Sequence, residues 1–483
     1  MRTIVIVPLV IFLLFIFIRT DTASSHELLG FVKQALQYSD TAYDIKDNDV
    51  LSDLLVQTEE HQFDYKLIPL TTIGFADDTG SQTLGLEVTR KLTFGTEIRA
   101  GIRSDRTDLD TGYTVENSNT ARAYIKISQG LFRRWGKKYN EAPLTIAKLK
   151  NEKQRLINDR LRQDLILRTA TEYYQLVLAR ELITLAEKAL ARSREHLEAA
   201  TSRHSVDLVS KVDVYRAEIA TLNAENNVQE KRFAFQRAQN NFRQTLGMND
   251  DKPLHLSDPV RMLVPVVPEN WEEVLPDNRL EWQAYRISKR YKNLSRYRAE
   301  EALQPDIQLN LGFEQQGQGN SFEEAASLDE TRWSIQFELR SSLDTFNEKN
   351  ALAREQISIQ KLKRHGASLR RRIIREAREA LENLQSQERY YQINNKRLKQ
   401  AESALDLTKI RYERGLSDNL DLLDAENAYA SAEFDISSGL IAYNIAALKL
   451  AHAMGVLNLE WLELSQKNSA LMNSPDSSLS VTN

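Results

Sequence analysis

One stretch of this chain occurs twice, and this repeat limits the possible folds more than any other feature. Residues 203–220, RHSVDLVSKVDVYRAEIA, align without a gap with residues 411–428, RYERGLSDNLDLLDAENA, at an offset of 208 residues. The same offset places Gly247 on Gly455, near the end of each long amphipathic tract. We therefore expect a duplicated unit, in which each half is built around two long helices joined by one short turn.

Two tracts without helix-breaking proline surround these turns. No proline occurs within residues 144–252 or 306–474, and apolar residues recur in both tracts mostly every three to five positions among Lys, Arg and Glu. This spacing predicts long helices with an apolar stripe, over about residues 141–248 and 345–456. A helix over residues 141–203 would be roughly 95 Å long at about 1.5 Å per residue. Such a helix needs neighbouring helices to cover its stripe.

Shorter segments between the helical tracts alternate apolar and polar residues, as strands with one apolar face do. They lie within about residues 68–128 in the first half and residues 305–340 in the second. The clearest apolar series is Trp333, Ile335, Phe337 and Leu339. We expect one hairpin in each half, hence four strands. Two earlier segments, at residues 68–75 and 83–88, either extend the sheet or lie outside it.

The alternating strands fit two kinds of protein. A membrane barrel has lipid on its apolar face and water on the other, whereas a soluble sheet with one solvated face gives the same alternation. Four strands cannot close a pore, so a barrel would require several chains. The N-terminus favours the barrel, because Arg2 precedes an apolar run over residues 4–18 that small residues follow, as in an export signal. A retained membrane anchor is the alternative, although the run is short for a spanning helix.

Composition argues against most kinds of chemistry. The chain has no cysteine, which excludes disulfides, thiolate metal sites and cysteine nucleophiles. Its seven histidines lack metal-binding spacing, and no phosphate-binding loop, dinucleotide fingerprint or nucleophile elbow is present. The net charge of −4 argues against nucleic acid as the main partner. We expect neither an enzyme nor a cofactor, and no nucleic-acid partner.

An export signal, a helix, a hairpin, a long helix, a turn and a helix lead to a Pro-rich junction, after which the unit recurs. The most specific segments are LQPDIQLNLGF at residues 303–313, the second copy of the repeat at residues 411–428, and Met-Gly-Val at residues 454–456. In this order and in these segments the chain resembles the TolC-like outer-membrane efflux protein family. Residues 275–305 also resemble the entry helix of the family's second half. One departure is Asp207, which stands where a turn glycine is usual.

The resemblance implies a division of the chain and a mainly α fold with β structure. The expected parts are a signal peptide (residues 1–25), a first structural repeat (26–250), a Pro-rich equatorial junction (251–278), a second structural repeat (279–456) and a C-terminal tail (457–483). Three chains would form an α-helical tunnel in the periplasm, continuous with a twelve-stranded outer-membrane barrel to which each chain gives four strands. Trp333, Ile335, Phe337 and Leu339 would then face lipid.

The resemblance also implies a function and partners. Proteins of this family act as exit ducts of tripartite efflux or type I secretion systems. The expected partners are two further copies of the chain, a periplasmic adaptor, an inner-membrane transporter and outer-membrane lipid. The alternative that the sequence leaves open is a non-channel coiled-coil protein of the cell envelope.

By resemblance, the two repeated turns form the periplasmic tip of the tunnel. Their expected residues are Leu208 in the first turn and Gly415, Leu416 and Ser417 in the second. Asp421 and Asp424 match the family's acidic rings at the entrance, where three copies of each would favour cations. Helix capping is the alternative for Asp421, which lies three residues after Asp418.

Asp213 and Tyr412 match residues that hold the entrance closed in the family through bonds between neighbouring helices. A phenol that donates to a carboxylate forms a charge-assisted bond. Ser417 replaces the family's basic partner at this gate. We expect either a looser closed state or a substitute cation from Lys211 or Arg414.

Overall fold

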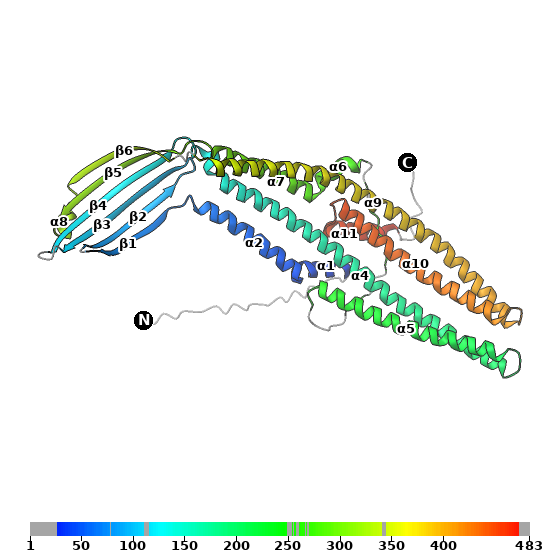
Figure 1. Ribbon diagram of the computed structural model, residues 1–483. Coiled ribbons are helices and arrows are strands. Elements are labelled where there is room, and N and C mark those ends of the chain that lie inside the picture. The colour runs from blue at the N-terminus through cyan, green and yellow to red at the C-terminus, as the bar shows by residue number, and fades with distance from the viewer. Residues whose placement is uncertain are drawn as a thin grey trace, which may run out of the picture.

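The computed structural model describes residues 27–77, 79–110, 115–248, 270–340 and 344–472, together with a few residues between 254 and 267. The expected signal peptide lies outside the described residues. The strands gather at one end of an elongated molecule, and long helices run from them to the opposite end (Figure 1). The predicted fold class, mainly α with an antiparallel sheet, is therefore confirmed.

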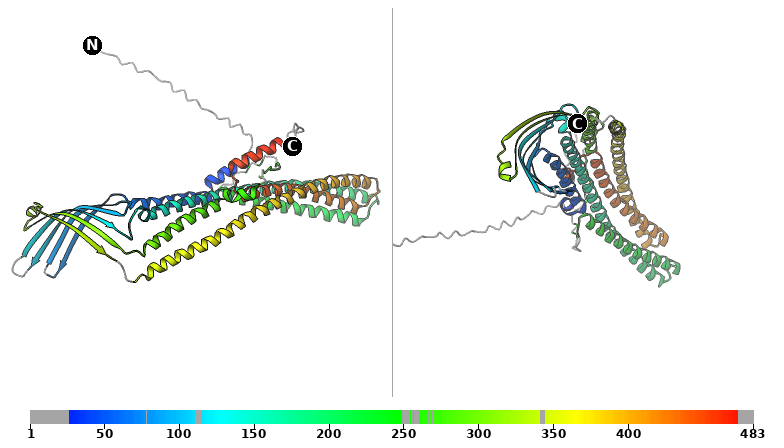
Figure 2. Two further views of the ribbon diagram at one scale, coloured as in Figure 1. Left: turned by 90° about the horizontal axis from the view of Figure 1, so that it is seen from above. Right: turned by 60° about the vertical axis from the view of Figure 1, so that its left-hand side comes forward.

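Four long helices form two antiparallel pairs, one in each half. They are α4 (Ala142–His204) with α5 (Lys211–Thr245), and α9 (Phe346–Glu413) with α10 (Asn419–Ala453). A shorter helix enters each half ahead of its strands: α2 (Asp40–His61) and α7 (Leu280–Glu301). The remaining helices are α1 (Glu27–Tyr38), α3 (Lys137–Asn140), α6 (Trp271–Asn278), α8 (Phe322–Ala325) and α11 (Leu459–Met472). Part of the expected C-terminal tail is thus helical, and α11 lies beside α1 on one side of the long helices (Figure 2).

The hydrophobic core lies midway along the long helices, where α1 and α11 pack against them. Its members include Phe242 and Leu448, which are fully buried, and Leu165. Phe31 of α1 packs edge-on against Phe242 of α5, with ring centroids 5.1 Å apart. Aromatic side chains bury large apolar areas, so this cluster fixes the shorter helices on the long ones.

Apolar side chains along α5 remain exposed beyond this core. Val212, Tyr215, Ile219 and Leu222 are each at least half exposed and follow one another at intervals of three and four residues. This interval is the one at which a helix presents a continuous seam to a neighbouring helix. The single chain therefore leaves this seam of α5 uncovered.

The strands form one antiparallel sheet in chain order, from β1 at one edge to β6 at the other. The strands are β1 (Lys66–Ala76), β2 (Thr79–Lys91), β3 (Thr96–Asp110), β4 (Val115–Gly130), β5 (Ile307–Gly319) and β6 (Glu330–Leu339). The halves join where β4 pairs with β5, with Ile125 opposite Phe313. Each strand is long enough to span the apolar layer of a bilayer when tilted.

The expectation of four strands, one hairpin per half, is wrong: over the residues that the structure describes, the first half contributes four strands and the second half two. Sequence periodicity left β1 and β2 undecided for a physical reason. Ile68 and Leu70 place apolar side chains on the otherwise polar face of β1, and Pro69 and Gly74 are poor strand formers. The strict alternation that identified β3 to β6 is therefore absent from β1.

Candidate functional site

The two turns at the far end of the long helices have the same backbone structure. In the first turn Asp207 has a φ of 60°, and in the second Gly415 has a φ of 70°. In each turn the next residue donates its backbone N–H to a carbonyl five residues back, Leu208 to Arg203 at 3.0 Å and Leu416 to Arg411 at 2.8 Å. This is the usual glycine-type ending of a helix. Asp207 adopts it because Asp tolerates the left-handed region better than most residues do.

A capping box begins the helix that follows each turn. In the first, the Ser210 hydroxyl accepts the backbone N–H of Asp213; in the second, the Asp418 carboxylate accepts the backbone N–H of Asp421 at 2.9 Å. Each third-position carboxylate accepts the N–H of its own cap residue in return. The capping interpretation of Asp421 therefore describes its contacts within one chain.

The two acidic residues expected at the entrance lie in different surroundings. The Ser417 hydroxyl donates to Asp421 at 2.6 Å, and this bond, together with the backbone N–H of Asp418, lowers the pKa of Asp421. Asp424 is exposed one turn further along α10 and has no hydrogen-bond or ion-pair partner among the residues that the structure describes. Asp424 is thus the freer of the two charges.

The expected bond between Asp213 and Tyr412 is not formed within the single chain. The carboxylate of Asp213 contacts Ser210 and lies 3.6 Å from the guanidinium of Arg216. The ring of Tyr412 is 4% exposed, and over the described part of the chain its buried hydroxyl has no hydrogen-bond partner.

Arg203, at the end of α4, holds the end of α9. Its guanidinium lies 4.2 Å from the ring centroid of Tyr412 and donates to the backbone carbonyls of Tyr412 and Glu413, at 2.9 and 3.3 Å. A cation suits these carbonyls because the C-terminus of a helix carries partial negative charge. Neither Lys211 nor Arg414, the two cations suggested by the sequence, makes this contact.

A second set of contacts joins the two turns beside Arg203. His196 of α4 stacks on Tyr412 with ring centroids 5.6 Å apart, and its Nε2 is hydrogen-bonded to the side chain of Asn419. The amide of Asn419 donates to the backbone carbonyl of Asp213 at 3.2 Å. Sequence reasoning did not identify Arg203 or His196 as tip residues, and it gave Asn419, which lies within the expected tip segment 415–424, no role. The one available signal was the position of Arg203 opposite Arg411 at the start of the repeat.

A cavity of about 380 Å³ adjoins this contact between α4, α9 and α10. Charged side chains dominate its lining, among them Arg192, Arg203, Lys409 and Glu426. Burial raises the pKa of Glu426, and the nearby His196 and Arg192 offset this only in part. The space beside Tyr412 is therefore polar and holds a carboxyl with a raised pKa.

The tip also carries exposed apolar side chains. Leu208 is 73% exposed and Leu416 65%, and Val206 and Leu420 are also exposed beside them. Gly415 has open space where a side chain would lie. Exposed apolar residues gathered at one end of a molecule mark a contact surface.

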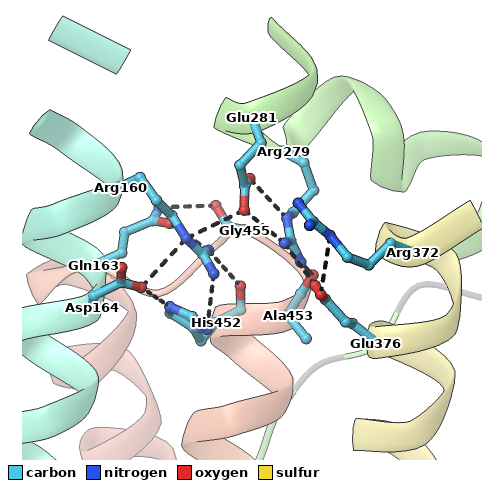
Figure 3. Close-up of polar contacts among 10 residues, drawn as sticks. All are labelled: Arg160, Gln163, Asp164, Arg279, Glu281, Arg372, Glu376, His452, Ala453 and Gly455. Carbon is cyan, nitrogen blue, oxygen red and sulfur yellow. Dashed lines mark hydrogen bonds and ion pairs between the residues drawn. The ribbon is translucent and has the colours of Figure 1, made fainter. Parts of the chain in front are cut away.

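A buried ionic network lies midway along the molecule, at the start of α7 (Figure 3). Arg279 is 1% exposed; it donates to the carbonyl of Ala453 at the end of α10 and to the carboxylates of Glu281 and Glu376, at 2.6, 2.8 and 3.0 Å. Burial by itself would raise the pKa of Glu281, yet the bond and charge of Arg279 outweigh burial and lower it. The buried arginine is thus paired on both sides.

The same network extends to α4. Arg160 lies 3.3 Å from both Asp164 and Glu281, and Asp164 is bonded to the ring of His452. Burial would raise the pKa of Asp164, but the bond with His452 and the charge of Arg160 lower it overall. The contacts of Arg160 and Arg279 connect α4, α7, α9 and the end of α10 in one belt (Figure 3). We call these residues the belt network: Arg160, Asp164, Arg279, Glu281, Glu376 and His452.

The opposite end of the molecule bears the strand residues expected to meet lipid. Trp333, Ile335, Phe337 and Leu339 lie on one face of β6 and are 57% to 75% exposed. None of the helices in the described part of the chain is long and apolar enough to cross a membrane. Over the same residues, no group of three or more His, Asp or Glu side chains could hold a metal ion.

Comparison with known proteins identifies the family. The sequence profile of the outer membrane efflux protein family matches residues 97–248 and 283–456, which is more than half of the chain. The chain belongs to the outer membrane efflux protein family. A comparison of this efflux protein with curated proteins gave no match.

Solved structures share the fold of this efflux protein at low sequence identity. The outer membrane protein VceC from Vibrio cholerae is 15% identical, with a TM-score of 0.68 over 89% of this chain and 96% of VceC. The open state of the Neisseria gonorrhoeae MtrE outer membrane channel is 17% identical, with a TM-score of 0.70 over 89% of both chains. The Campylobacter jejuni CmeC outer membrane channel is 13% identical, with a TM-score of 0.67 over 92% of this chain and 89% of CmeC.

Proposed function

We propose that this efflux protein is one of three identical chains of an exit duct in the outer membrane. The observation that carries the proposal is the difference between the two ends of the molecule. An amphipathic sheet lies at one end, and a tip with exposed acidic and apolar side chains lies at the other. The long helices between them would cross the periplasm. Outer-membrane lipid would meet Trp333, Ile335, Phe337 and Leu339, and we assign the chain no catalytic role and no cofactor.

The uncovered seam on α5 supports assembly with further copies of the chain. Val212, Ile219 and Leu222 have no cover in the single chain, and a helix of a neighbouring copy would bury them. Replacing Ile219 and Leu222 by aspartate should abolish the trimer, because burying two carboxylates opposes the gain from apolar contact. Replacing the exposed asparagines Asn223 and Asn227 by aspartate adds the same two charges to α5 and is the matched control.

The tip would be the entrance of the duct and the docking surface for a periplasmic adaptor, which connects it to an inner-membrane transporter. Asp424, three times repeated, would form an acidic ring at the entrance, with Asp421 behind it. The apolar side chains of Leu208 and Leu416 would contact the adaptor, with Gly415 and Ser417 setting the shape of the turn.

Tyr412 and Asp213 would hold the closed entrance, together with Arg203. Arg203 takes the role expected of a basic gate residue, because it binds the end of α9 from the neighbouring α4. Asp213 contributes through its backbone carbonyl, which Asn419 binds. Single-channel conductance of Tyr412→Ala and Asn419→Ala tests this role, because these changes remove the ring beneath Arg203 and the amide that binds the Asp213 carbonyl. Values no higher than wild type would contradict it.

Cell fractionation and planar bilayers test the function as a whole. We expect the purified protein in outer-membrane fractions and discrete conductance steps after its addition to a bilayer. A soluble oligomer without conductance would instead support the second candidate, a coiled-coil protein of the envelope, for which the uncovered α5 seam is the specific argument.

A further inference from the structure

The two halves of the chain differ between the entry helix and the first strand that they share. In the second half, α7 ends at Glu301 and β5 begins at Ile307; in the first, α2 ends at His61 and the corresponding β3 begins at Thr96. The β1–β2 hairpin fills this longer interval. The family match also begins at residue 97 in the first half but at residue 283, inside the entry helix, in the second. The hairpin is thus an addition to the duplicated unit.

The added hairpin continues the apolar face of the sheet. The register aligns one apolar row across all six strands: Leu67, Val88, Ala100, Ile125, Phe313 and Trp333. At the two ends of this row Leu67 is 65% and Trp333 75% exposed. A surface that faces lipid across β3 to β6 therefore extends without interruption over β2 and β1.

Side chains on the polar face bind the hairpin to the rest of the sheet. Tyr124 of β4 crosses β3 and donates its hydroxyl to Glu87 of β2 at 2.7 Å. It can cross because β3 has Gly101 at that point, where an added Cβ would lie 2.9 Å from the Tyr124 hydroxyl. Thr83 of β2 likewise donates to Asp105 of β3 at 2.7 Å. The hairpin is therefore built into the sheet on both faces.

We propose that the β1–β2 hairpin is part of the barrel wall and that β1 of each chain pairs with β6 of a second copy, so that three chains close an eighteen-stranded barrel. This rests on the trimeric duct proposed above and adds its strand number and its edge contact. β1 and β6 are the edges of the sheet, and backbone groups at an edge must find partners within a bilayer. With an even number of alternating strands, β6 and the next β1 run antiparallel.

Strand length and side-chain facing select one register for this contact. If β1 and the neighbouring β6 overlap over their full length and their apolar side chains lie on the same face, Leu67 lies opposite Leu339 and Ile73 opposite Trp333 of the neighbour. Within one chain, the row of paired residues that starts at Leu67 of β1 ends at Trp333 of β6. In the next chain this row continues at Ile73 instead of Leu67, so it is displaced by six residues for each chain. This shift is about 20 Å along the strands over about 29 Å across six strands. It corresponds to a strand tilt of roughly 35°, within the range of membrane barrels.

Engineered disulfides test the contact, because the chain has no cysteine of its own. In this register Thr72 and Ser334 of the neighbour face each other on the polar face, whereas in one chain they lie on opposite edges of the sheet. After oxidation in outer membranes, Thr72→Cys with Ser334→Cys should yield a covalent trimer that reductant returns to the single chain. Thr72→Cys with Ile335→Cys, whose side chains point to opposite faces, is the matched control and should yield none.

The competing arrangement is a twelve-stranded barrel in which β3 forms the edge and the hairpin lies elsewhere. Asp105→Cys with Ser334→Cys would then give the covalent trimer, and a cross-section by electron microscopy would contain twelve strands. Either result overturns the proposal while leaving the duct intact. Eighteen strands with the Thr72 crosslink support it. The wild-type chain tests the duct itself. If it is absent from outer membranes and gives no conductance steps, the proposed function is wrong.

Discussion

The two turns at the tip have one backbone structure but are held in different ways. Each is capped by its own residues, Ser210 with Asp213 in the first and Asp418 with Asp421 in the second. The second is also held from outside, since Arg203 and His196 of the first repeat contact its Tyr412. A duplication that began with equal halves has therefore become unequal in the support that the other repeat gives to each turn.

This difference leads to an expectation about which helices move. A helix end that is bound by a side chain of another helix pair is released when that contact breaks, whereas the capping boxes keep the shape of both turns. The second turn also carries Asp424, while the first has Arg216 at the corresponding position. We therefore expect opening to displace α9 and α10 relative to α4 and α5, and the following variants compare matching positions of the two repeats.

The largest effect is expected where each repeat ends. Gly247 and Gly455 both have positive φ, but a Cβ on Gly247 would lie 2.1 Å from the carbonyl oxygen of Tyr38, against 2.9 Å from that of Asn278 for Gly455. Gly247→Ala should lower the free energy of unfolding by about 3 kcal/mol or more, and Gly455→Ala by about 2 kcal/mol. Thermal unfolding followed by circular dichroism measures both. A smaller loss for Gly247→Ala than for Gly455→Ala would contradict the ranking.

The next effect concerns the unequal support of the turns. Arg203→Ala should lower the free energy of unfolding by about 2 kcal/mol, because two carbonyls at the end of α9 lose a charged donor, and it should raise single-channel conductance. Arg411→Ala, at the matching position, should change little, since over the described residues the guanidinium of Arg411 makes one long hydrogen bond, at 3.5 Å, to the carbonyl of Leu416 in its own turn. Equal conductance of the two variants would rule out a special role for Arg203.

A smaller effect is expected from exchanging the turn residues. Asp207→Gly should stabilise the first turn by about 0.5 kcal/mol, and Gly415→Asp should destabilise the second by about 1 kcal/mol, because glycine occupies positive φ at lower cost. Nothing lies within 4 Å of a Cβ on Gly415, so steric overlap does not contribute to the change in stability of Gly415→Asp. Unfolding midpoints that shift in the same direction for both variants would show that local contacts, not φ, decide these positions.

The smallest effect on stability is expected from the free acid. Asp424→Asn should leave the free energy of unfolding within about 0.5 kcal/mol of wild type, since Asp424 is exposed. Reversal potentials in a salt gradient should nevertheless show a weaker preference for cations. Arg216→Gln is the comparison at the matching position, and a loss of cation preference as large as that of Asp424→Asn would argue against a ring formed by the second turn.

Sequence reasoning succeeded where a pattern is periodic and failed where a contact crosses between repeats. The apolar stripe and the absence of proline predicted a helix over residues 141–203, and α4 spans Ala142–His204. The added β1–β2 hairpin was left undecided because apolar residues lie on both faces of β1. The pairing of Arg203 with the end of α9 was missed, because no local spacing reveals which residues of two distant helices meet.

The belt network gives the molecule the mechanics of a lever. Arg160 fixes α4 at the belt, about 66 Å from the end of that helix at His204 but only about 27 Å from its start at Ala142, at roughly 1.5 Å per residue. A rotation of about 5° around this fulcrum would carry the tip by roughly 6 Å and the sheet end of α4 by only about 2 Å. In the proposed duct, a barrel held rigid by its strands would lie at the short arm, while the proposed entrance at the long arm would move through a distance comparable to the diameter of a hydrated ion.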